Sequence, residues 1–353
     1  FFHLTSCILS QTSPVFYMLK PPQNHPPSYH YQQELTPYPD RNDEKSSSTL
    51  SIRDTSDIKI HVLPTSKQKA VIDIISGYNG ATLIHLADDT MMIYGYNAHG
   101  QLGLNHFDYV NHTEIPKWCQ TMKIKQIFSG ISSKHSLLIT NNNKLYAVGN
   151  NLYHQFAIKT DANTLAQWTE ITNSFPSNVE NIKMIATSSQ CTTFLMENGE
   201  IYQTMYEQPY IQLIKSDIKF KQIASGKSHV LMISEDDELY SLGFNNYGQC
   251  GVRGIKQTKS PLKVTFFDQM ALKIENIACG QDHSIVLTKQ NKIYCFGRND
   301  CYQIGNGSNH ANIISIPQKN ETLEQIHERI IDIKCGAFHN MVITENGEYY
   351  LWG

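Results

Sequence analysis

The sequence predicts an all-β fold made of six copies of one small antiparallel sheet. Two glycine positions recur along the chain, and each pair brackets an apolar run, a polar turn and a run that contains an aromatic residue. The first position is occupied by Gly77, Gly130, Ser188, Gly226, Gly280 and Gly336. The second is occupied by Gly95, Gly149, Met205, Gly243, Gly297 and Gly353. Successive copies start 53 to 58 residues apart, except for one interval of 38. Repeats of about this length with several strands each are typical of a β-propeller of four-stranded blades.

Three strands can be assigned within each copy. The first is short and apolar, as at 274–277, and the second is almost continuously apolar, as at 284–288, which suits a strand covered on both faces. A tight turn follows, and Asn346-Gly347 there predicts a hairpin because such turns need positive φ. The third strand carries an aromatic residue, as at 293–296. The fourth must come from the variable segment that follows, where 264–267 and 169–171 are candidates.

The segments outside these copies are less regular. Residues 1–57 are rich in Pro, Ser and polar residues, and we expect them to be disordered, with the propeller spanning 58–353. Residues 58–62 alternate apolar and polar and predict an isolated strand, and 323–330 could form a short linker helix. Residues 1–20 are too polar to cross a membrane and lack the charged start of a signal peptide, so no membrane association is expected.

Charge and cysteine content narrow the function classes. The 353 residues carry 29 Lys and Arg against 32 Asp and Glu, and no basic arm precedes the repeats, so direct nucleic-acid binding is not expected. The eight cysteines form no CxxC pair. Cys279 and Cys335 occupy the same slot in successive copies, and we read them as buried free thiols. Free thiols fit a reducing compartment, which predicts an intracellular protein of the cytoplasm, the nucleus or both.

The loop after the third strand is the most specific motif. In the first copy it reads Gly95-Tyr-Asn97-Ala-His-Gly100-Gln101-Leu-Gly103, and a G-x-x-H-[ST] element recurs earlier in several copies. Together these elements resemble the repeat of the regulator of chromosome condensation family, across residues 71–353. The third copy has lost the loop and has Cys191 in place of the histidine. The matching positions are Gly95, Asn97, Gly100, Gln101, Gly103, Gly149, Asn151, Gln155, His229, Gly243, Asn245, Gly248, Gln249, Gly251, His283, Gly297, Asn299, Gln303, Gly305 and His339.

These residues have a structural interpretation. Gly100 and Gly103 bracket a loop that must reverse direction, which predicts positive φ at both. Asn97 can cap turn amides, and Gln101 can bind backbone either of its own blade or of the next. The recurring His135, His229, His283 and His339 fall on a circle, one per blade, which is too wide for a shared metal ion. We expect buried histidines that tie turns to backbone.

No catalytic, cofactor-binding or metal-binding residue is predicted. The sequence contains no phosphate-binding G-x-x-x-x-G-K-[ST] loop, no H-E-x-x-H and no G-x-S-x-G. The acid pairs Asp88-Asp89 and Asp236-Asp237 fall in predicted hairpin turns, where we expect solvated side chains. The chain is therefore not expected to be an enzyme, apart from possible nucleotide exchange.

Three functions follow from the resemblance, because a fold alone does not fix one. The first is a protein-interaction platform. The second is a guanine nucleotide exchange factor for a Ran-like small GTPase, as in the family's founding members. Those members act through a wedge that has no matching stretch here. The third is the regulatory or substrate-recruiting propeller of a larger HECT-type ubiquitin ligase.

The two ends of the chain raise the question of ring closure. The chain starts at Phe1 rather than methionine and stops at Gly353, inside its sixth copy. Either residues 58–62 return as the outer strand of the last blade, or about one further repeat completes seven blades. The second alternative is the one favoured by the resemblance. A complete ring has no exposed sheet edge and is expected to be monomeric.

Overall fold

The computed structural model divides the chain into two units, residues 1–68 and 69–353. It describes residues 71–353 except 89, 115, 117, 119–120, 159–161, 205–207 and 307–310. The predicted strand at 58–62 and the predicted disorder of residues 1–57 therefore lie outside the described residues. Everything below concerns the second unit.

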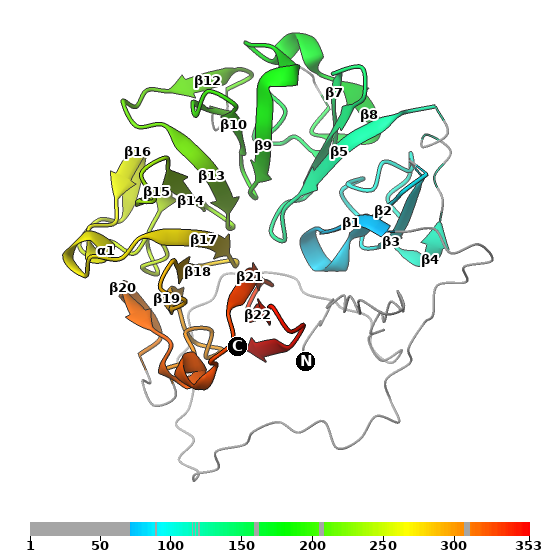
Figure 1. Ribbon diagram of the computed structural model, residues 1–353. Coiled ribbons are helices and arrows are strands. Elements are labelled where there is room, and N and C mark those ends of the chain that lie inside the picture. Colours follow the sequence, from blue (N-terminus) through cyan, green and yellow to red (C-terminus); the bar gives the residue numbers. More distant parts are fainter. Residues whose placement is uncertain are drawn as a thin grey trace, which may run out of the picture. The chain divides into compact units, whose positions relative to one another are not determined.

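The described residues form six antiparallel sheets, which we call blades 1 to 6 in chain order. Blades 1 to 5 have four strands each, and blade 6 has three described strands. The strands of each blade pair in sequence order, and the first strands of consecutive blades contact one another around a common centre (Figure 1). The predicted all-β propeller with six repeats is confirmed.

The strand boundaries follow the repeat. Blades 1 to 3 contain β1 (Val71–Ser76), β2 (Thr82–Leu86), β3 (Met91–Gly95), β4 (Val110–Glu114), β5 (Ile124–Ser129), β6 (His135–Thr140), β7 (Leu145–Asn150), β8 (Thr164–Glu170), β9 (Ile182–Thr187), β10 (Thr192–Met196), β11 (Ile201–Thr204) and β12 (Ile211–Ile214). Blades 4 to 6 contain β13 (Phe220–Ser225), β14 (His229–Ser234), β15 (Leu239–Phe244), β16 (Gln257–Lys263), β17 (Ile274–Cys279), β18 (His283–Thr288), β19 (Ile293–Arg298), β20 (Ile313–Lys319), β21 (Ile330–Cys335), β22 (Asn340–Thr344) and β23 (Tyr349–Trp352).

Within the described residues, the helical segments that have defined bounds are short turns between strands. These are η1 (Tyr78–Gly80), η3 (Thr172–Ser174), η4 (Val179–Asn181), α1 (Phe266–Gln269) and η5 (Glu321–Gln325). The last lies at the start of the linker for which the sequence predicts a helix at 323–330.

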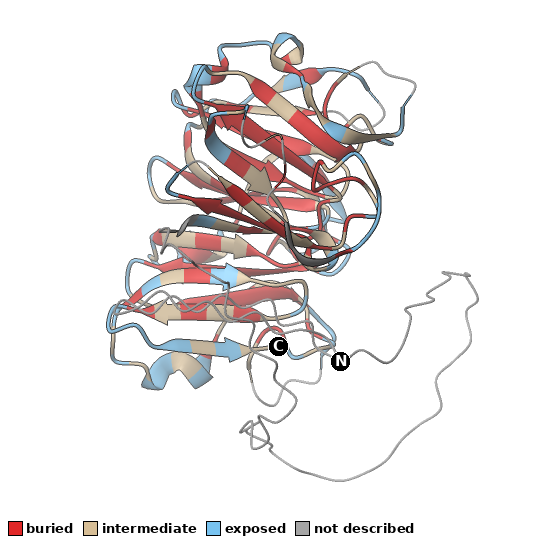
Figure 2. Cartoon of the chain, turned by 90° about the vertical axis from the view of Figure 1, so that its right-hand side faces the viewer, coloured by how far each residue is buried: buried red, intermediate tan, exposed pale blue. Residues whose placement is uncertain are grey.

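The core lies between neighbouring blades. In blades 1 to 5 the second strand is covered on both faces, and all six residues of β14 are buried. Leu231 and Ile233 of that strand belong to one cluster with Ile277 and Phe296 of blade 5. Buried residues run along the strands, and exposed residues gather at the turns (Figure 2). This packing explains why the second strand reads as a continuous apolar run.

The predicted position of the fourth strand in blade 4 is wrong. That strand is β16, and the candidate at 264–267 leaves the sheet and enters α1. The reason is that this fourth strand lies at the outer edge of its blade and is mostly polar, with every residue except Thr258 exposed or half-buried. The apolar Val264 and Phe267 instead turn inward and are 1% and 2% exposed, closing the core between blades 4 and 5. In blade 2, β8 contains most of the other candidate, 169–171.

The blade topology creates two chemically separate ends of the propeller. We call the hairpin face the end that carries the turns between second and third strands, at 141–144, 197–200, 235–238, 289–292 and 345–348. We call the loop face the opposite end. It carries the turns between first and second strands, at 77–81, 130–134, 188–191, 226–228, 280–282 and 336–339, and the loops that follow third strands.

Candidate functional site

The repeat loop on the loop face is organised by its asparagine. In blade 4 the Asn245 Oδ1 accepts from the Cys250 amide at 2.9 Å, and its Nδ2 donates to the carbonyls of Val252 and Ile255, both at 2.7 Å. Asn97, Asn151 and Asn299 accept equivalent bonds from the amides of Leu102, Phe156 and Ile304. The predicted capping role of the asparagine is confirmed.

The loop reverses direction through left-handed backbone. Gly100 and Gly103 have φ of 68° and 70°, as the sequence predicts. Degenerate copies keep this geometry without glycine, because His154 and Tyr302 at the equivalent position have φ of 59° and 60°. A non-glycine residue in this region costs roughly 1–2 kcal/mol. The loop shape is therefore retained even where its preferred residue is not.

The loop glutamine holds its own loop and in one copy reaches the next blade. The Oε1 atoms of Gln101, Gln155, Gln249 and Gln303 accept from the amide two residues earlier, at 2.9–3.0 Å. In blade 2 the Nε2 of Gln155 also donates to the Ser189 carbonyl of blade 3 at 3.1 Å. The sequence left these two roles as alternatives, and Gln155 fills both.

The recurring histidine joins adjacent blades. The Nε2 of His229 lies 3.0 Å from the Ser284 Oγ of blade 5, and that hydroxyl donates to the Gln249 carbonyl at 2.8 Å. Ser284 uses its proton on the carbonyl, so His229 must be the donor in the first bond and carries its proton on Nε2. Burial lowers the pKa of His229 to about 3, so the ring is neutral. We call this arrangement the inter-blade relay. A histidine of one blade bonds a hydroxyl or amide side chain of the next blade, and that side chain donates to a loop carbonyl of the first blade.

The relay recurs at two other blade junctions. His135 meets Thr192 at 2.8 Å, and Thr192 donates to the Gln155 carbonyl at 2.9 Å. Between blades 5 and 6, His283 and the Gln303 carbonyl are bridged by Asn340, at 2.9 and 2.7 Å. These three histidines are buried, as expected, and each is tied to a backbone carbonyl through a side chain of the next blade.

The relay is interrupted where the repeat degenerates. Ala81 in blade 1 and Cys191 in blade 3 occupy the histidine position. Opposite Cys191, blade 4 presents the apolar Val230 in place of a hydroxyl. His339 of blade 6 is only half-buried, and no bond from its ring to a further blade is present among the described residues. The G-x-x-H-[ST] element marked Ser284 as well as the histidines, but the sequence did not show that Thr192, Ser284 and Asn340 bond the histidine of the preceding blade, because the two partners lie 55 to 57 positions apart.

The loop face gathers the exposed apolar side chains. Among the described residues fourteen large apolar side chains are exposed, and ten of them lie on this face. These ten are Phe107, Tyr109, Leu152, Tyr210, Phe244, Tyr247, Ile255, Tyr302, Ile313 and Phe338. The guanidinium of Arg298 stacks over the Tyr247 ring of the neighbouring blade at 5.3 Å, and Asp300 holds it at 2.5 Å. Tyrosine and arginine are enriched at protein interfaces.

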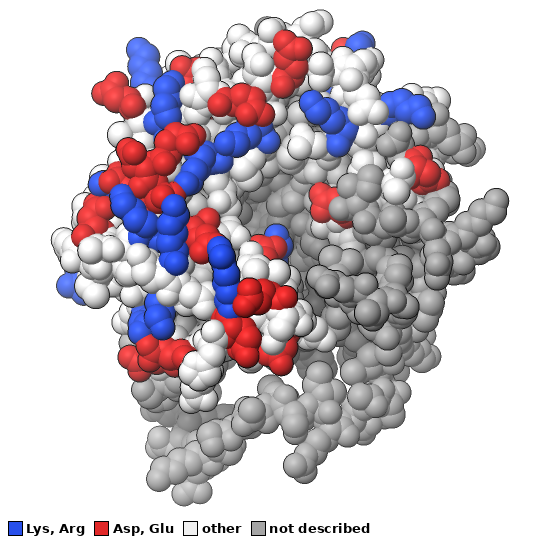
Figure 3. Space-filling view, in the orientation of Figure 1, with Lys and Arg blue, Asp and Glu red and all other residues white. Residues whose placement is uncertain are grey.

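The hairpin face instead carries most of the ion pairs. Acidic and basic side chains are interspersed over blades 4 and 5 (Figure 3). Further pairs on this face include Lys144 with Glu170 at 2.9 Å and Arg329 with Glu275 at 2.9 Å. Charges that are already paired with one another are a weak basis for recognition of a partner.

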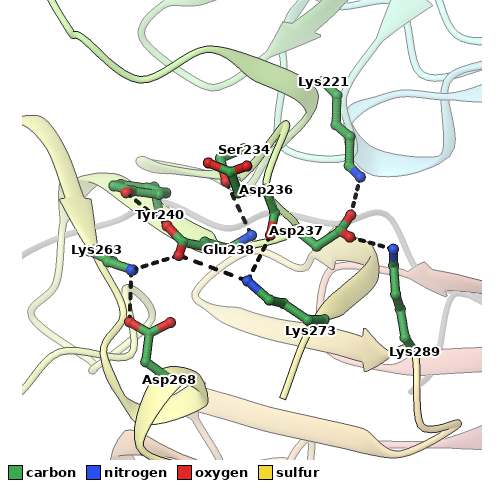
Figure 4. Close-up of polar contacts among 10 residues, drawn as sticks. All are labelled: Lys221, Ser234, Asp236, Asp237, Glu238, Tyr240, Lys263, Asp268, Lys273 and Lys289. Carbon is green, nitrogen blue, oxygen red and sulfur yellow. Dashed lines mark hydrogen bonds and ion pairs between the residues drawn. The ribbon is translucent and has the colours of Figure 1, made fainter. Parts of the chain in front are cut away.

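Asp237 is the centre of one such network, and its expected solvation is wrong. Its carboxylate contacts the ammonium groups of Lys221 in blade 4 and Lys289 in blade 5 (Figure 4). Its side chain is only 18% exposed. Burial raises the pKa of Asp237, but the two lysines outweigh burial and the pKa is lowered overall. Glu238 beside it accepts from Lys263 at 2.9 Å. The network ties blade 4 to blade 5.

Comparison with known families decides the identity of the repeat. Sequence profiles described as the regulator of chromosome condensation (RCC1) repeat match residues 236–287 and 290–343, and also 124–155, 220–249 and 274–303. The chain belongs to the RCC1 repeat family. The matched segments contain the relay histidines His135, His229 and His283 and the loop glutamines Gln155, Gln249 and Gln303.

Two curated RCC1-type relatives illustrate how different the host proteins can be. The E3 ubiquitin-protein ligase HERC2 of Homo sapiens is 25% identical over 292 residues, which is 76% of this chain and 6% of HERC2. The ultraviolet-B receptor UVR8 of Arabidopsis thaliana is 25% identical over 316 residues, which is 82% of this chain and 68% of that protein.

Solved structures share the RCC1 propeller fold. Human WBSCR16 superposes with a TM-score of 0.68 at 22% identity, covering 81% of this chain and 77% of that one. Prp20p from Saccharomyces cerevisiae superposes with a TM-score of 0.65 at 20% identity, covering 80% and 72%.

Two kinds of functional feature are absent from the described part of this RCC1 propeller. It contains no group of three metal-ligating side chains and no helix long and apolar enough to cross a bilayer. A pocket of about 540 Å³ opens on the hairpin face and is lined by Glu275, Lys289, Asn291, His327, Arg329 and Glu345. Arg329 pairs with Glu275, and Lys289 pairs with Asp237, so the basic groups of this pocket are already engaged.

Proposed function

We propose that this propeller is a protein-interaction platform whose partners dock on the loop face. The observation that carries the proposal is the separation of surface chemistry, with exposed aromatic and aliphatic side chains on the loop face and mutually paired charges on the hairpin face. Soluble proteins seldom expose many large apolar groups on one face without a binding purpose. The protein acts by binding alone, inside the cell.

The relatives support a protein as the class of partner. The Prp20p structure is described together with the binding properties of this protein to Gsp1p and histones, and another structure holds Kap60 bound to yeast RCC1. The chain corresponds to 6% of HERC2, so ligase activity belongs to that larger protein. A propeller of this type beside a ligase domain would recruit or regulate.

The test of the platform proposal compares the two faces. Phe244→Ser with Tyr247→Ser removes two exposed loop-face rings, which are 38% and 37% exposed. Met270→Ser is the matched control on the hairpin face, where Met270 is 56% exposed. Each variant is compared with wild type in quantitative affinity capture from cell extract. Proteins whose recovery falls with the loop-face variant, and not with the control, support the proposal. Equal recovery in all three contradicts it.

Nucleotide exchange is the second candidate function, favoured by the shared fold with Prp20p, whose binding properties to Gsp1p are described. It is tested separately by release of a fluorescent guanine nucleotide from a Ran-type GTPase. We expect no acceleration, because no stretch of the sequence matches the wedge of the exchange factors. Acceleration by wild type that is lost in the loop-face variant would assign exchange activity to this face.

A further inference from the structure

Two lysines lie near the propeller axis on the loop face, outside the repeat motifs. Lys134 ends the turn between β5 and β6, and Lys227 is the middle residue of the turn between β13 and β14. Among the described residues neither ammonium has a carboxylate within ion-pair distance, whereas most hairpin-face lysines do. Two cations are therefore held on one face without paired counter-charges.

The turns that carry them are fixed by hydrogen bonds between blades. The Tyr78 amide donates to the Ser133 carbonyl at 3.3 Å, beside Lys134. The Ser189 amide donates to the Lys227 carbonyl at 3.0 Å, and the Lys227 amide donates to the Gln281 carbonyl at 2.9 Å. Because the backbone at both positions is anchored to adjacent blades, the two side chains start from preset positions.

Aromatic rings position the Lys134 ammonium. It lies 5.1 Å from the centre of the Tyr78 ring, a cation–π arrangement. Tyr78 packs edge-on against Tyr96 at 5.7 Å, and Tyr96 packs against His99 at 5.9 Å. Burial, and then the charge of Lys134, lower the pKa of His99 to about 4, so this histidine is neutral. This aromatic cluster therefore holds the Lys134 cation and contains no anionic group.

Hydrogen bonds through blade 3 link the two lysine-bearing blades, because Gln155 of blade 2 donates to the Ser189 carbonyl at 3.1 Å and the Ser189 amide donates to the Lys227 carbonyl at 3.0 Å. Burial, and then the charge of Lys227, lower the pKa of Lys134. Like charges held together favour the binding of an anion that neutralises both.

Neighbouring acidic groups do not cancel the positive charge of the two lysines. The charge of Lys227 acts on Asp282, but burial raises the pKa of this acid, its side chain is only 6% exposed and it lies 3.7 Å from Arg298. Asp300 binds the same guanidinium at 2.5 Å. The three cations Lys134, Lys227 and Arg298 thus face two acids, one of them buried. Among these five charged groups the cations outnumber the acids by one.

We propose that Lys134 and Lys227 bind carboxylate groups of an acidic segment in a partner protein, with Tyr78 and Tyr247 as the apolar border of the site. The inference rests on the proposed platform function and names the chemistry of its partner. An acidic protein is favoured over nucleic acid because the site has only two cations, one of them over a tyrosine ring. A nucleic acid requires a long basic stripe, and the whole chain carries a net charge of −3.

The test measures binding of a fluorescein-labelled glutamate-rich peptide to the full chain by fluorescence anisotropy. A peptide with glutamine in place of every glutamate, inorganic phosphate and a short oligothymidylate serve as comparison ligands. The variant is Lys134→Gln with Lys227→Gln. The charge-matched control is Lys123→Gln with Lys125→Gln, two exposed lysines at the hairpin-face end of blade 2. Lys134→Arg tests whether a retained charge suffices, and thermal unfolding checks that each variant folds.

We expect wild type to prefer the glutamate peptide over the glutamine peptide, and the preference to weaken as salt is added. The paired variant should bind about tenfold more weakly, while the control and Lys134→Arg stay within about twofold of wild type. Equal losses in the variant and the control would overturn the site in favour of diffuse attraction. Tighter binding of oligothymidylate would overturn it in favour of nucleic acid, and tighter binding of phosphate would reduce it to a simple ion site.

The outcome can be separated from that of the platform proposal. If captured proteins depend on Phe244 and Tyr247 but the peptide shows no dependence on the lysine pair, only the acidic-segment inference fails. If neither capture nor peptide binding depends on the loop face, the platform proposal fails as well.

Discussion

His229 and Ser284 stand 55 positions apart in the sequence and join blades 4 and 5 through one buried hydrogen bond of 3.0 Å. Ser284 continues to the Gln249 carbonyl at 2.8 Å, so two repeat elements from one blade meet at a single hydroxyl of the next. The repeat motif thus encodes contacts between blades as well as the shape of each blade.

Removing the hydroxyl of this relay should destabilise the fold. Ser284→Ala leaves the Nε2–H of His229 and the Gln249 carbonyl buried without their partner, at a cost of about 1–3 kcal/mol for such a group. Ser260→Ala, on the exposed strand β16, is the control and should change stability by less than about 0.5 kcal/mol. Urea unfolding of both variants measures the difference. Equal stabilities would mean that the relay contributes nothing.

Stability should fall as the pH drops below 6.5. The pKa is lowered by burial to about 3 for His135 and His229 and to about 4 for His283, where Asn340 partly offsets the lowering. Unfolded histidine titrates near 6.5, so between pH 6.5 and 4 the unfolded chain binds protons that the folded chain does not. The stabilisation is complete above pH 6.5 and is lost toward acid, by up to about 1.4 kcal/mol per pH unit for each histidine.

The comparison that checks this uses unfolding free energies at pH 7.0 and 5.5. His229→Gln should show a smaller loss than wild type over the same interval, because one buried titrating group is gone. A wild-type stability that is flat over this interval would contradict the assignment of neutral buried rings.

The propeller could be predicted from the sequence alone because the same motif recurs in successive repeats. The glycines, the loop asparagine and the loop glutamine act within one repeat, so Asn97 and Gly100 could be assigned from their neighbours. The partners of the relay could not, since Ser284 meets His229 only when two blades pack. The exposed outer strand β16 was missed because its polar sequence resembles a loop, and the pairing of Asp237 depends on a lysine of the next blade.

The Asp237 network should contribute to the joint between blades 4 and 5. Asp237→Asn keeps a residue that tolerates the observed φ of 63° and removes only the charge shared by Lys221 and Lys289. We expect a loss of about 1–2 kcal/mol that shrinks in high salt. The adjacent exposed Asp236→Asn is the control and should be nearly neutral. A loss at Asp236 as large as at Asp237 would argue against a specific clamp.

Two glycines of blade 4 separate backbone conformation from packing. Gly248 has φ of 76° and Gly254 has φ of 81°. A Cβ at Gly248 would lie 2.5 Å from the Ser315 Cα of blade 5, whereas a Cβ at Gly254 meets nothing within 4 Å. Gly254→Ala should cost about 1 kcal/mol, the cost of the left-handed backbone. Gly248→Ala should cost at least about 2 kcal/mol more, because the backbone of blade 5 must move. Equal thermal shifts in the two variants would rule out the inter-blade contact as the cause.

The most direct test of the docking face is site-specific photo-crosslinking in cells. A benzophenone amino acid replaces either Tyr247 or Tyr302 on the loop face, or Met270 or Lys292 at the hairpin face, with each variant expressed at the same level. The account predicts crosslinked partner proteins from the two loop-face positions and none from the hairpin-face positions. Crosslinks from Met270 or Lys292, with none from Tyr247 and Tyr302, would contradict it.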